Sequence, residues 1–255
     1  MNLLSNPFDD PAAVRARAEQ GDPLVMYLVI NRTAVAEVDF STLACALART
    51  VVACSEQFGR HPLWQANFAA WYRDSFRKVT LDANPRDWTK LLAEGEGNLV
   101  VAENLVAVLP PRPRSTNSAL LRSLQTYKSP LPVFEAPIWT ETDVPQVLLA
   151  INPELEMTAG KALAQIGHAA LMVSEASGMN GGDSWFAVLA GWSGVDFRLV
   201  KPTSAGWRGA LSEIPAIVVT DSGLTETAPG SQTVLATQPA AEKTLRTYRD
   251  LLTAA

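Results

Sequence analysis

The sequence predicts an α/β protein made of two repeated three-layer α/β/α domains, each a mixed sheet of about four strands flanked by helices. Three observations support this fold class. A set of aromatic residues recurs at a near-constant spacing, strand-like apolar runs alternate with helical stretches, and the composition suits buried cores. The 255 residues are 47% hydrophobic and 18% charged, so the chain has enough apolar material for one large or two ordinary domains.

The aromatic spacing divides the chain into two similar halves. Four aromatic residues of the first half are matched in the second half, three of them 121 residues later and the fourth 119 residues later. The pairs are Trp64 and Trp185, Trp71 and Trp192, Phe76 and Phe197, and Trp88 and Trp207. Because tryptophan is rare, we interpret the chain as the product of a duplication.

Each half is expected to follow the order strand, helix, helix, strand, short helix, strand, final strand. The first strands are residues 25–30 and 147–151, and each is followed by a helix rich in small residues. Later strands are expected at 76–81 and 99–102 in the first half, and at 197–201, 217–220 and 233–236 in the second. A proline-containing turn is expected at Pro110-Pro111 and at Pro229-Gly230.

These elements give five segments. Residues 1–22 form a polar lead-in, 23–114 the first repeat, 115–143 a proline-rich linker, 144–240 the second repeat and 241–255 a terminal helix. Prolines favour extended and turn conformations, which is why the linker is placed between the repeats.

Several classes of protein are disfavoured. The longest apolar run, Leu24 to Ile30, is too short to cross a bilayer, so no membrane association is expected. Asp9 and Asp10 precede any apolar stretch, which argues against a signal peptide and favours the cytoplasm. Cys45 and Cys54 are nine residues apart and, on one helix, face opposite sides, so no disulfide is expected. With two histidines in the chain, we expect no metal.

The net charge of −5 is uneven along the chain. Residues 1–128 hold 14 Lys and Arg against 13 Asp and Glu, a net of +1, whereas residues 129–255 hold 7 against 13, a net of −6. A strongly basic protein would point to nucleic acid. Any RNA binding by this chain must therefore depend on a local basic patch.

The stretch from Met157 to Ala170 is the first candidate site. With Thr158 as N-cap, Lys161, Gln165 and His168 fall at i, i+4 and i+7 and form one polar stripe on an apolar helix. Gly160 beside the first turn would let a ligand backbone or phosphate approach the free amides. The alternative is a core histidine with a buried acceptor and a solvated lysine.

The second candidate stretch follows the strand at 217–220. Asp221 ends that strand, Ser222-Gly223 forms a turn and Thr225 follows. An aspartate at such a place is either a catalytic or orienting carboxylate or a turn former that bonds its own backbone. Taken alone, this stretch favours the turn former.

Together the two stretches resemble the type 2 peptidyl-tRNA hydrolase family over roughly residues 144–240. The family pattern is Gly-Lys-x-x-Ala-Gln-x-x-His-Ala, then Asp-x-Gly-x-Thr, then Pro-Gly-x-x-Thr-Val-Leu. The matching residues are Gly160, Lys161, Ala164, Gln165, His168, Ala169, Asp221, Gly223, Thr225, Pro229, Gly230, Thr233, Val234 and Leu235. Trp185 and the strand ending at Lys201 fall where the family has a Trp-bearing helix and a Lys-bearing strand.

The resemblance implies hydrolysis of the ester that joins a peptide to the 3′ end of tRNA, without metal or organic cofactor. His168, aligned by Asp221, would orient or deprotonate the attacking water. Lys161 would offset charge on the developing oxyanion or a nearby phosphate, and Thr225 would hydrogen-bond the water or the ester. The residues expected to bind substrate are Gly160, Gln165, Gly223 and Lys201.

Two features depart from the family. Leu224 replaces a side chain that is often polar or basic, and the second half is acidic. The first repeat has lost the polar set: Ser41, Cys45, Ala48, Glu103, Leu105 and Ala107 stand where the second repeat has Lys161, Gln165, His168, Asp221, Gly223 and Thr225.

The first repeat is therefore expected to be structural. Since the family commonly forms dimers, it could act as the second subunit of an intramolecular pseudo-dimer, and a homodimer is the other arrangement. Its basic residues could contact RNA or could be ordinary solvated surface: Arg73, Arg77, Lys78, Arg86, Lys90, Arg112 and Arg114. The competing function is a catalytically inactive tRNA-binding, protein-binding or scaffold protein that keeps the hydrolase fold.

Overall fold

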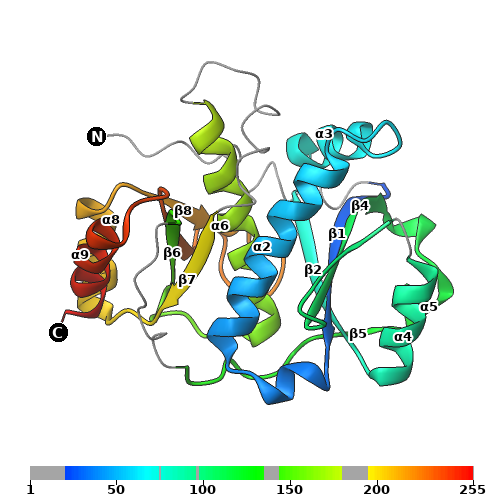
Figure 1. Ribbon diagram of the computed structural model, residues 1–255, viewed down its shortest axis with the longest axis horizontal. Coiled ribbons are helices and arrows are strands. Elements are labelled where there is room, and N and C mark those ends of the chain that lie inside the picture. Colours follow the sequence, from blue (N-terminus) through cyan, green and yellow to red (C-terminus); the bar gives the residue numbers. More distant parts are fainter. Residues whose placement is uncertain (1–20, 75, 96–97, 135–143, 180–194, 255) are drawn as a thin grey trace.

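Two mixed β-sheets with helices on both faces form the protein, described by a computed structural model over residues 21–74, 76–95, 98–134, 144–179 and 195–254 (Figure 1). This arrangement confirms the predicted fold class of two α/β units. The first sheet has five strands in the order β3-β4-β1-β2-β5, and the second has four in the order β7-β6-β9-β8. The strands of the first sheet are β1 (Leu24–Asn31), β2 (Arg77–Ala83), β3 (Val100–Ala102), β4 (Val106–Pro113) and β5 (Gln125–Thr126). Those of the second are β6 (Gln146–Ile151), β7 (Asp196–Val200), β8 (Ala216–Thr220) and β9 (Gln232–Thr237).

The two sheets share one topology. In the first, β1 pairs parallel with β2 and antiparallel with β4, and β3 pairs antiparallel with β4. In the second, β6 pairs parallel with β7 and antiparallel with β9, and β8 pairs antiparallel with β9. The strands therefore correspond one to one in chain order, as a duplication predicts, and β5 is an addition at the edge of the first sheet.

The helices fill the connections that the sequence indicates. Asp39, Asn84 and Thr203 cap α2, α4 and α8, because each side chain accepts a hydrogen bond from a backbone N–H of the first turn. The helices are η1 (Ala34–Glu37), α2 (Phe40–Phe58), α3 (Gln65–Asp74), α4 (Pro85–Glu94), η2 (Arg114–Thr116), α5 (Ala119–Ser123), α6 (Ala159–Met179), α8 (Ser204–Glu213) and α9 (Glu242–Thr253).

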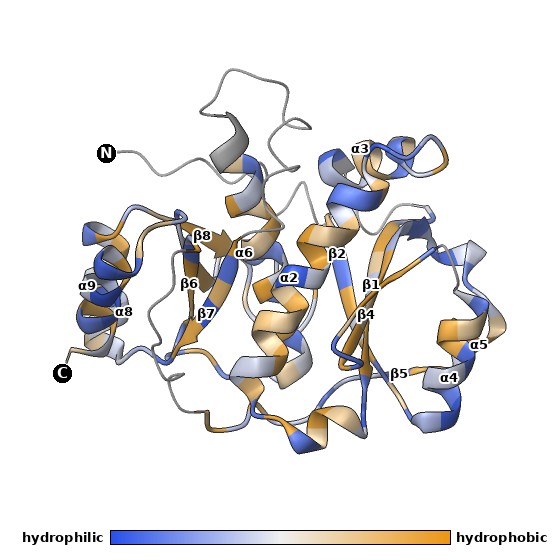
Figure 2. Ribbon diagram, viewed as in Figure 1, coloured by the Kyte–Doolittle hydropathy of each residue, from blue (hydrophilic) through white to orange (hydrophobic). Residues whose placement is uncertain are grey.

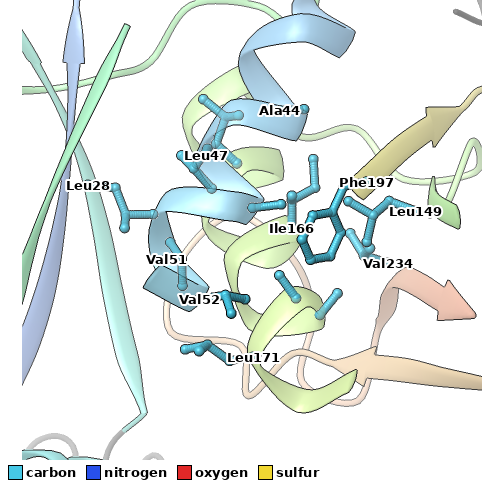
Figure 3. Packing of buried hydrophobic residues seen from close by; sticks show 14 of the residues in the cluster. Leu28, Ala44, Leu47, Val51, Val52, Leu149, Ile166, Leu171, Phe197 and Val234 are labelled. Atoms are coloured by element: carbon cyan, nitrogen blue, oxygen red, sulfur yellow. The ribbon is translucent and has the colours of Figure 1, made fainter. Parts of the chain in front are cut away.

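Helices α2 and α6 lie side by side between the two sheets and join the repeats into one core (Figure 1). Both are predominantly apolar, whereas the outer helix α9 carries more hydrophilic residues (Figure 2). Leu28 of β1 points toward α2, while Ile166 of α6 lies beside Phe197 of the second sheet (Figure 3). Because one buried cluster contains residues of both sheets, neither repeat buries its inner face without the other.

The outer face of each sheet is covered in the same way. Trp88 of α4 packs on the first sheet and Trp207 of α8 on the second, and both are buried. Strand β1 is buried on both faces: Met26, Leu28 and Ile30 join the central core, and the residues between them join the outer one. This two-sided burial explains its continuous apolar run. Trp185 and Trp192 lie outside the described residues.

Two expectations along the chain need correction. Pro110 and Pro111 were expected in a turn but lie within β4. Strand β3 pairs with β4 only up to Val108, and the pairing of β1 with β4 shifts register between Val25 and Tyr27. The missing proline N–H groups therefore fall beside a bulge and an open edge, where they cost no ladder bond.

The segment expected as linker is partly structured. Residues 114–126 form η2, α5 and β5, and β5 pairs with β2 of the first sheet. The terminal helix is present as α9, and most of the polar lead-in lies outside the described residues. None of the helices described is both long and apolar enough to cross a membrane.

Candidate active site in a cavity between the repeats

A cavity of about 1000 Å³ lies between the two repeats. Strand β2 of the first repeat lines it with Arg77, Lys78 and Thr80, and α6 of the second lines it with Lys161, Gln165 and His168. The loop after β8 adds Asp221, Ser222, Leu224, Thr225 and Glu226. All four residues expected to be catalytic therefore line one space, and its opposite wall belongs to the repeat that has lost them.

The polar stripe of α6 lies where helical periodicity places it. The Thr158 hydroxyl accepts a hydrogen bond from the N–H of Lys161 at 3.2 Å, which confirms Thr158 as the N-cap. Lys161, Gln165 and His168 then recur on one side of α6 and line the cavity together, while residues such as Ile166 face the core. The stripe is therefore open to a ligand at its polar edge.

Asp221 is held by three donors. Its Oδ2 accepts hydrogen bonds from Lys161 Nζ and Gln165 Nε2, both at 2.6 Å, and its Oδ1 accepts one from the N–H of Gly223 at 2.7 Å. Gln165 is fixed in turn, since its Oε1 accepts a bond from the Thr233 hydroxyl at 2.9 Å. The Lys161 and Asp221 side chains are 9% and 8% exposed, so this is a nearly buried ion pair.

The ion pair leaves two hydrogen-bond donors for a ligand. Lys161 Nζ also donates to Thr225 Oγ1 at 3.0 Å, so two of its three N–H groups are used in the described contacts. Because that oxygen acts as an acceptor, the Thr225 O–H remains able to donate. A lysine N–H and a threonine O–H therefore lie next to each other on the cavity wall.

Gly223 shapes the turn that carries this site. Its φ of +74° is in the left-handed region, and a Cβ there would lie 2.4 Å from the ring of Pro229. Its N–H also fixes one oxygen of Asp221. Gly223 is not among the residues that line the cavity, and its observed role is to position Asp221.

Gly160 is needed for packing between segments. A Cβ there would lie 1.8 Å from the carbonyl oxygen of Tyr127, and the Gly160 carbonyl accepts a hydrogen bond from Thr80 at 2.9 Å. The carboxylate of Glu226 already bonds the N–H and hydroxyl of Thr158, both at 2.8 Å. The start of α6 therefore holds a carboxylate of the protein itself, which does not fit the expected approach of a phosphate at this place.

His168 interacts with the first repeat. Its Nδ1 lies 3.0 Å from Lys78 Nζ and its ring 4.8 Å from that of Phe76. The expected contact with Asp221 is absent, because Asp221 is bonded to Lys161 and Gln165. Burial, and then the charges of Lys78 and Lys161, hold the pKa of His168 well below its usual range. The ring is therefore neutral at pH 7 and takes up a proton weakly.

Lys78 is the most unusual residue of this wall. It is 7% exposed, and its Nζ lies 3.8 Å from the ring centroid of Phe76. Burial lowers its pKa well below the usual value, and the partial charge of Glu175 opposes this. Burial also raises the pKa of Glu175 to about 7. The sequence identified Lys78 as basic but gave no signal that it meets His168, 90 residues away.

The remaining expected residues are divided between the cavity and the surface. Lys201 is exposed after β7 and does not line the cavity. Of the basic residues of the first repeat, Arg77, Lys78 and Arg114 line it, and the sequence missed Arg122 and Lys128, which also do. With Lys161 the lining has six Lys and Arg residues, of which Lys78 has a lowered pKa, against Asp221 and Glu226. The cavity is therefore locally basic in a chain with a net charge of −5.

The parts of the chain that the structure describes contain no group of three or more His, Cys, Asp or Glu residues able to hold a metal ion. Cys45 and Cys54 are both buried in α2 and are not bonded to each other. In comparisons with known proteins, no family model matches the chain and no curated protein is significantly similar to it. The function must therefore be argued from the site.

Proposed function

We propose that the protein hydrolyses the ester bond of peptidyl-tRNA, with its reacting groups in the second repeat. The observation that carries this proposal is the linked set of Lys161, Asp221, Thr225 and Gln165 on the wall of a basic cavity. It joins groups suited to an ester carbonyl with the positive charge that an RNA substrate requires. The family resemblance of residues 144–240 points to the same reaction.

The geometry supports a separate role for each of these side chains in the reaction. Water attacks the ester carbonyl carbon, and the carbonyl oxygen gains negative charge as the tetrahedral intermediate forms. The third N–H of Lys161 and the O–H of Thr225 are placed to donate to that oxygen, while Asp221 holds Lys161 in position. The bond to the ribose oxygen then breaks, and that oxygen takes up the proton lost by the attacking water, which releases the peptide acid and the 3′ hydroxyl of tRNA.

His168 orients the water in this scheme. A neutral imidazole fixed at Nδ1 by Lys78 presents its other ring nitrogen for a hydrogen bond. Its lowered pKa makes it a poor acceptor of a full proton, so orientation is favoured over deprotonation. Asp221, expected to align His168, acts on Lys161.

The alternative is an inactive tRNA-binding protein that retains the fold. The observation that favours it is the ion pair between Lys161 and Asp221, because the carboxylate already neutralises the charge of the lysine. The lack of a strong general base at His168 points in the same direction. The basic lining of the cavity suits both functions, so only a turnover measurement separates them.

The test is release of labelled peptide from N-blocked aminoacyl-tRNA. We expect Lys161→Met and Thr225→Val each to lower kcat about 100- to 1000-fold, as removal of an oxyanion donor does. His168→Ala is assayed beside them, and unchanged turnover would remove its role. Lys243→Met is the matched control, because it removes an exposed lysine of α9 outside the cavity and should leave the rate unchanged. A folded wild type that binds tRNA without releasing peptide would establish the alternative.

A further inference from the structure

Arg77 is a cation without an ionic partner in the wall of the cavity. It is half-buried at the start of β2 and lines the cavity with Arg114. No ion pair or side-chain hydrogen bond of the described residues involves its guanidinium group. Burial, and then the neighbouring charge of Arg114, lower the pKa of Arg77.

The second repeat provides a direct comparison. By strand pairing, Arg77 lies beside Val25 of β1, and Asp196 lies beside Gln146 of β6, 121 residues after Val25. Asp196 therefore stands in β7 where Arg77 stands in β2, and it forms ion pairs with Arg49 at 2.8 Å and Arg198 at 3.3 Å. The same strand position thus carries a paired carboxylate in one repeat and, in the other, an arginine that faces the cavity and has no ion pair among the described residues.

Two further cations complete this wall, Arg122 and Lys128. Arg122 donates to the carbonyl of Asn117 at 2.5 Å, a neutral partner that leaves its charge unopposed. Asp22 is bonded to the hydroxyl and N–H of Ser115, keeps its negative charge and partly offsets that of Arg114. The acidic residues of the lining are Asp221 and Glu226, and both are engaged within the second repeat. Among the described residues, Arg77 and Arg122 are paired with no carboxylate, so the first-repeat wall keeps a net positive charge.

We propose that the wall formed by Arg77, Arg114, Arg122 and Lys128 binds the phosphodiester backbone of the RNA strand whose end carries the scissile ester. This inference rests on the proposed function and assigns the degenerate repeat a part in it. Guanidinium groups bind phosphate oxygens in a bidentate manner. One cavity holds both this wall and the Lys161 and Thr225 donors, as a substrate with an ester beside phosphates requires.

The direct test is binding of deacylated tRNA, measured by fluorescence polarisation at several salt concentrations. We expect Arg77→Gln and Arg114→Gln each to weaken binding about tenfold or more, and to reduce the salt slope by about 0.7 for each phosphate that the variant no longer neutralises. Arg86→Gln is the matched control, because Arg86 is exposed on α4 of the same repeat and outside the cavity. Arg77→Gln should keep or raise Tm, since it removes a repulsion and no bond.

Equal weakening by all three substitutions, no weakening by Arg77→Gln, or no binding of tRNA by the wild type would each overturn the proposal. Measurements of peptide release distinguish failure of the phosphate-site proposal from failure of the proposed hydrolase function. We expect Arg77→Gln to raise KM more than it lowers kcat. Binding that depends on Arg77 in a protein that never releases peptide would refute the hydrolase and keep the phosphate site. Peptide release with an unchanged KM in Arg77→Gln would refute the phosphate site and keep the hydrolase.

Discussion

We expect substitutions of Lys161 and Asp221 to have strongly coupled effects on the free energy of unfolding, because the two side chains form an ion pair. Asp221→Asn removes the charge that balances the ammonium group of Lys161, whose side chain is only 9% exposed, and an unpaired buried charge costs about 3–5 kcal/mol. Lys161→Met costs less, about 1.5–3 kcal/mol, because Asp221 keeps its bonds from Gln165 and Gly223. In the double variant no charge is left unpaired, so its cost should fall below the sum of the two single costs.

The magnitude is measurable in a chain of this size. At about 2–4 °C per kcal/mol, Asp221→Asn should lower Tm by roughly 6–20 °C. Urea denaturation of the wild type, both single variants and the double variant gives the coupling free energy, which we expect to be about 1–3 kcal/mol. The m-values should agree among the four proteins, so that the change reports stability alone.

A surface ion pair serves as the control for this cycle. Arg208 and Glu154 form a pair whose side chains are 62% and 42% exposed, and its coupling should be at most about 0.5 kcal/mol. If the costs of Asp221→Asn and Lys161→Met simply add, or if their coupling equals that of the control pair, the buried network around Asp221 does not exist in solution.

Three further predictions concern the turn, the buried acid and the thiols. Gly223→Ala should destabilise the folded protein by more than the roughly 1–2 kcal/mol of left-handed strain, because the added Cβ would lie 2.4 Å from the ring of Pro229. Gly230→Ala is the control for the strain alone, since Gly230 has a φ of +84° and nothing within 4 Å of an added Cβ. Equal losses of unfolding free energy for the two variants in urea denaturation would contradict the clash at Gly223. Glu175 has a pKa raised to about 7 in the folded protein, so the stability that its protonated form contributes is present below pH 4.5 and is lost as pH rises through 7. Between pH 5 and pH 8 the wild type should lose up to about 3 kcal/mol that Glu175→Gln does not, and parallel stability profiles would refute this. Burial raises the pKa of Cys45 to about 12 and raises that of Cys54 as well. Ellman's reagent should therefore label two thiols in denaturant and none in the native protein. Rapid labelling of the native protein would show that α2 is more accessible in solution than its burial between the sheets implies.

Local patterns account for the elements that the sequence predicted correctly. The run from Val25 to Ile30 is apolar at every position because β1 is buried on both faces, and such burial follows from being a central strand. The stripe of α6 follows from a helical period of 3.6 residues. Pro110 and Pro111 were wrongly placed in a turn. A proline can lie in a strand where the adjacent strand does not require its N–H as a hydrogen-bond donor, and the residues of that strand are far away in the sequence.

The features of the candidate site also separate into those that the sequence predicts and those that only the tertiary structure shows. The sequence by itself determined the repeat and the shared order of its elements, because the same residue types recur 119 to 121 positions later. It also determined the side of α6 that carries Lys161, Gln165 and His168 and the turn that carries Asp221, because these depend on residues a few positions apart. The tertiary structure alone decided that Asp221 pairs with Lys161, that Lys78 meets His168, and that the first repeat lines the cavity with Arg77, which has no ion pair among the described residues. Those interactions join segments about 60 to 90 residues apart, and their charges and pKa values depend on burial, which arises only when α2 and α6 pack between the sheets.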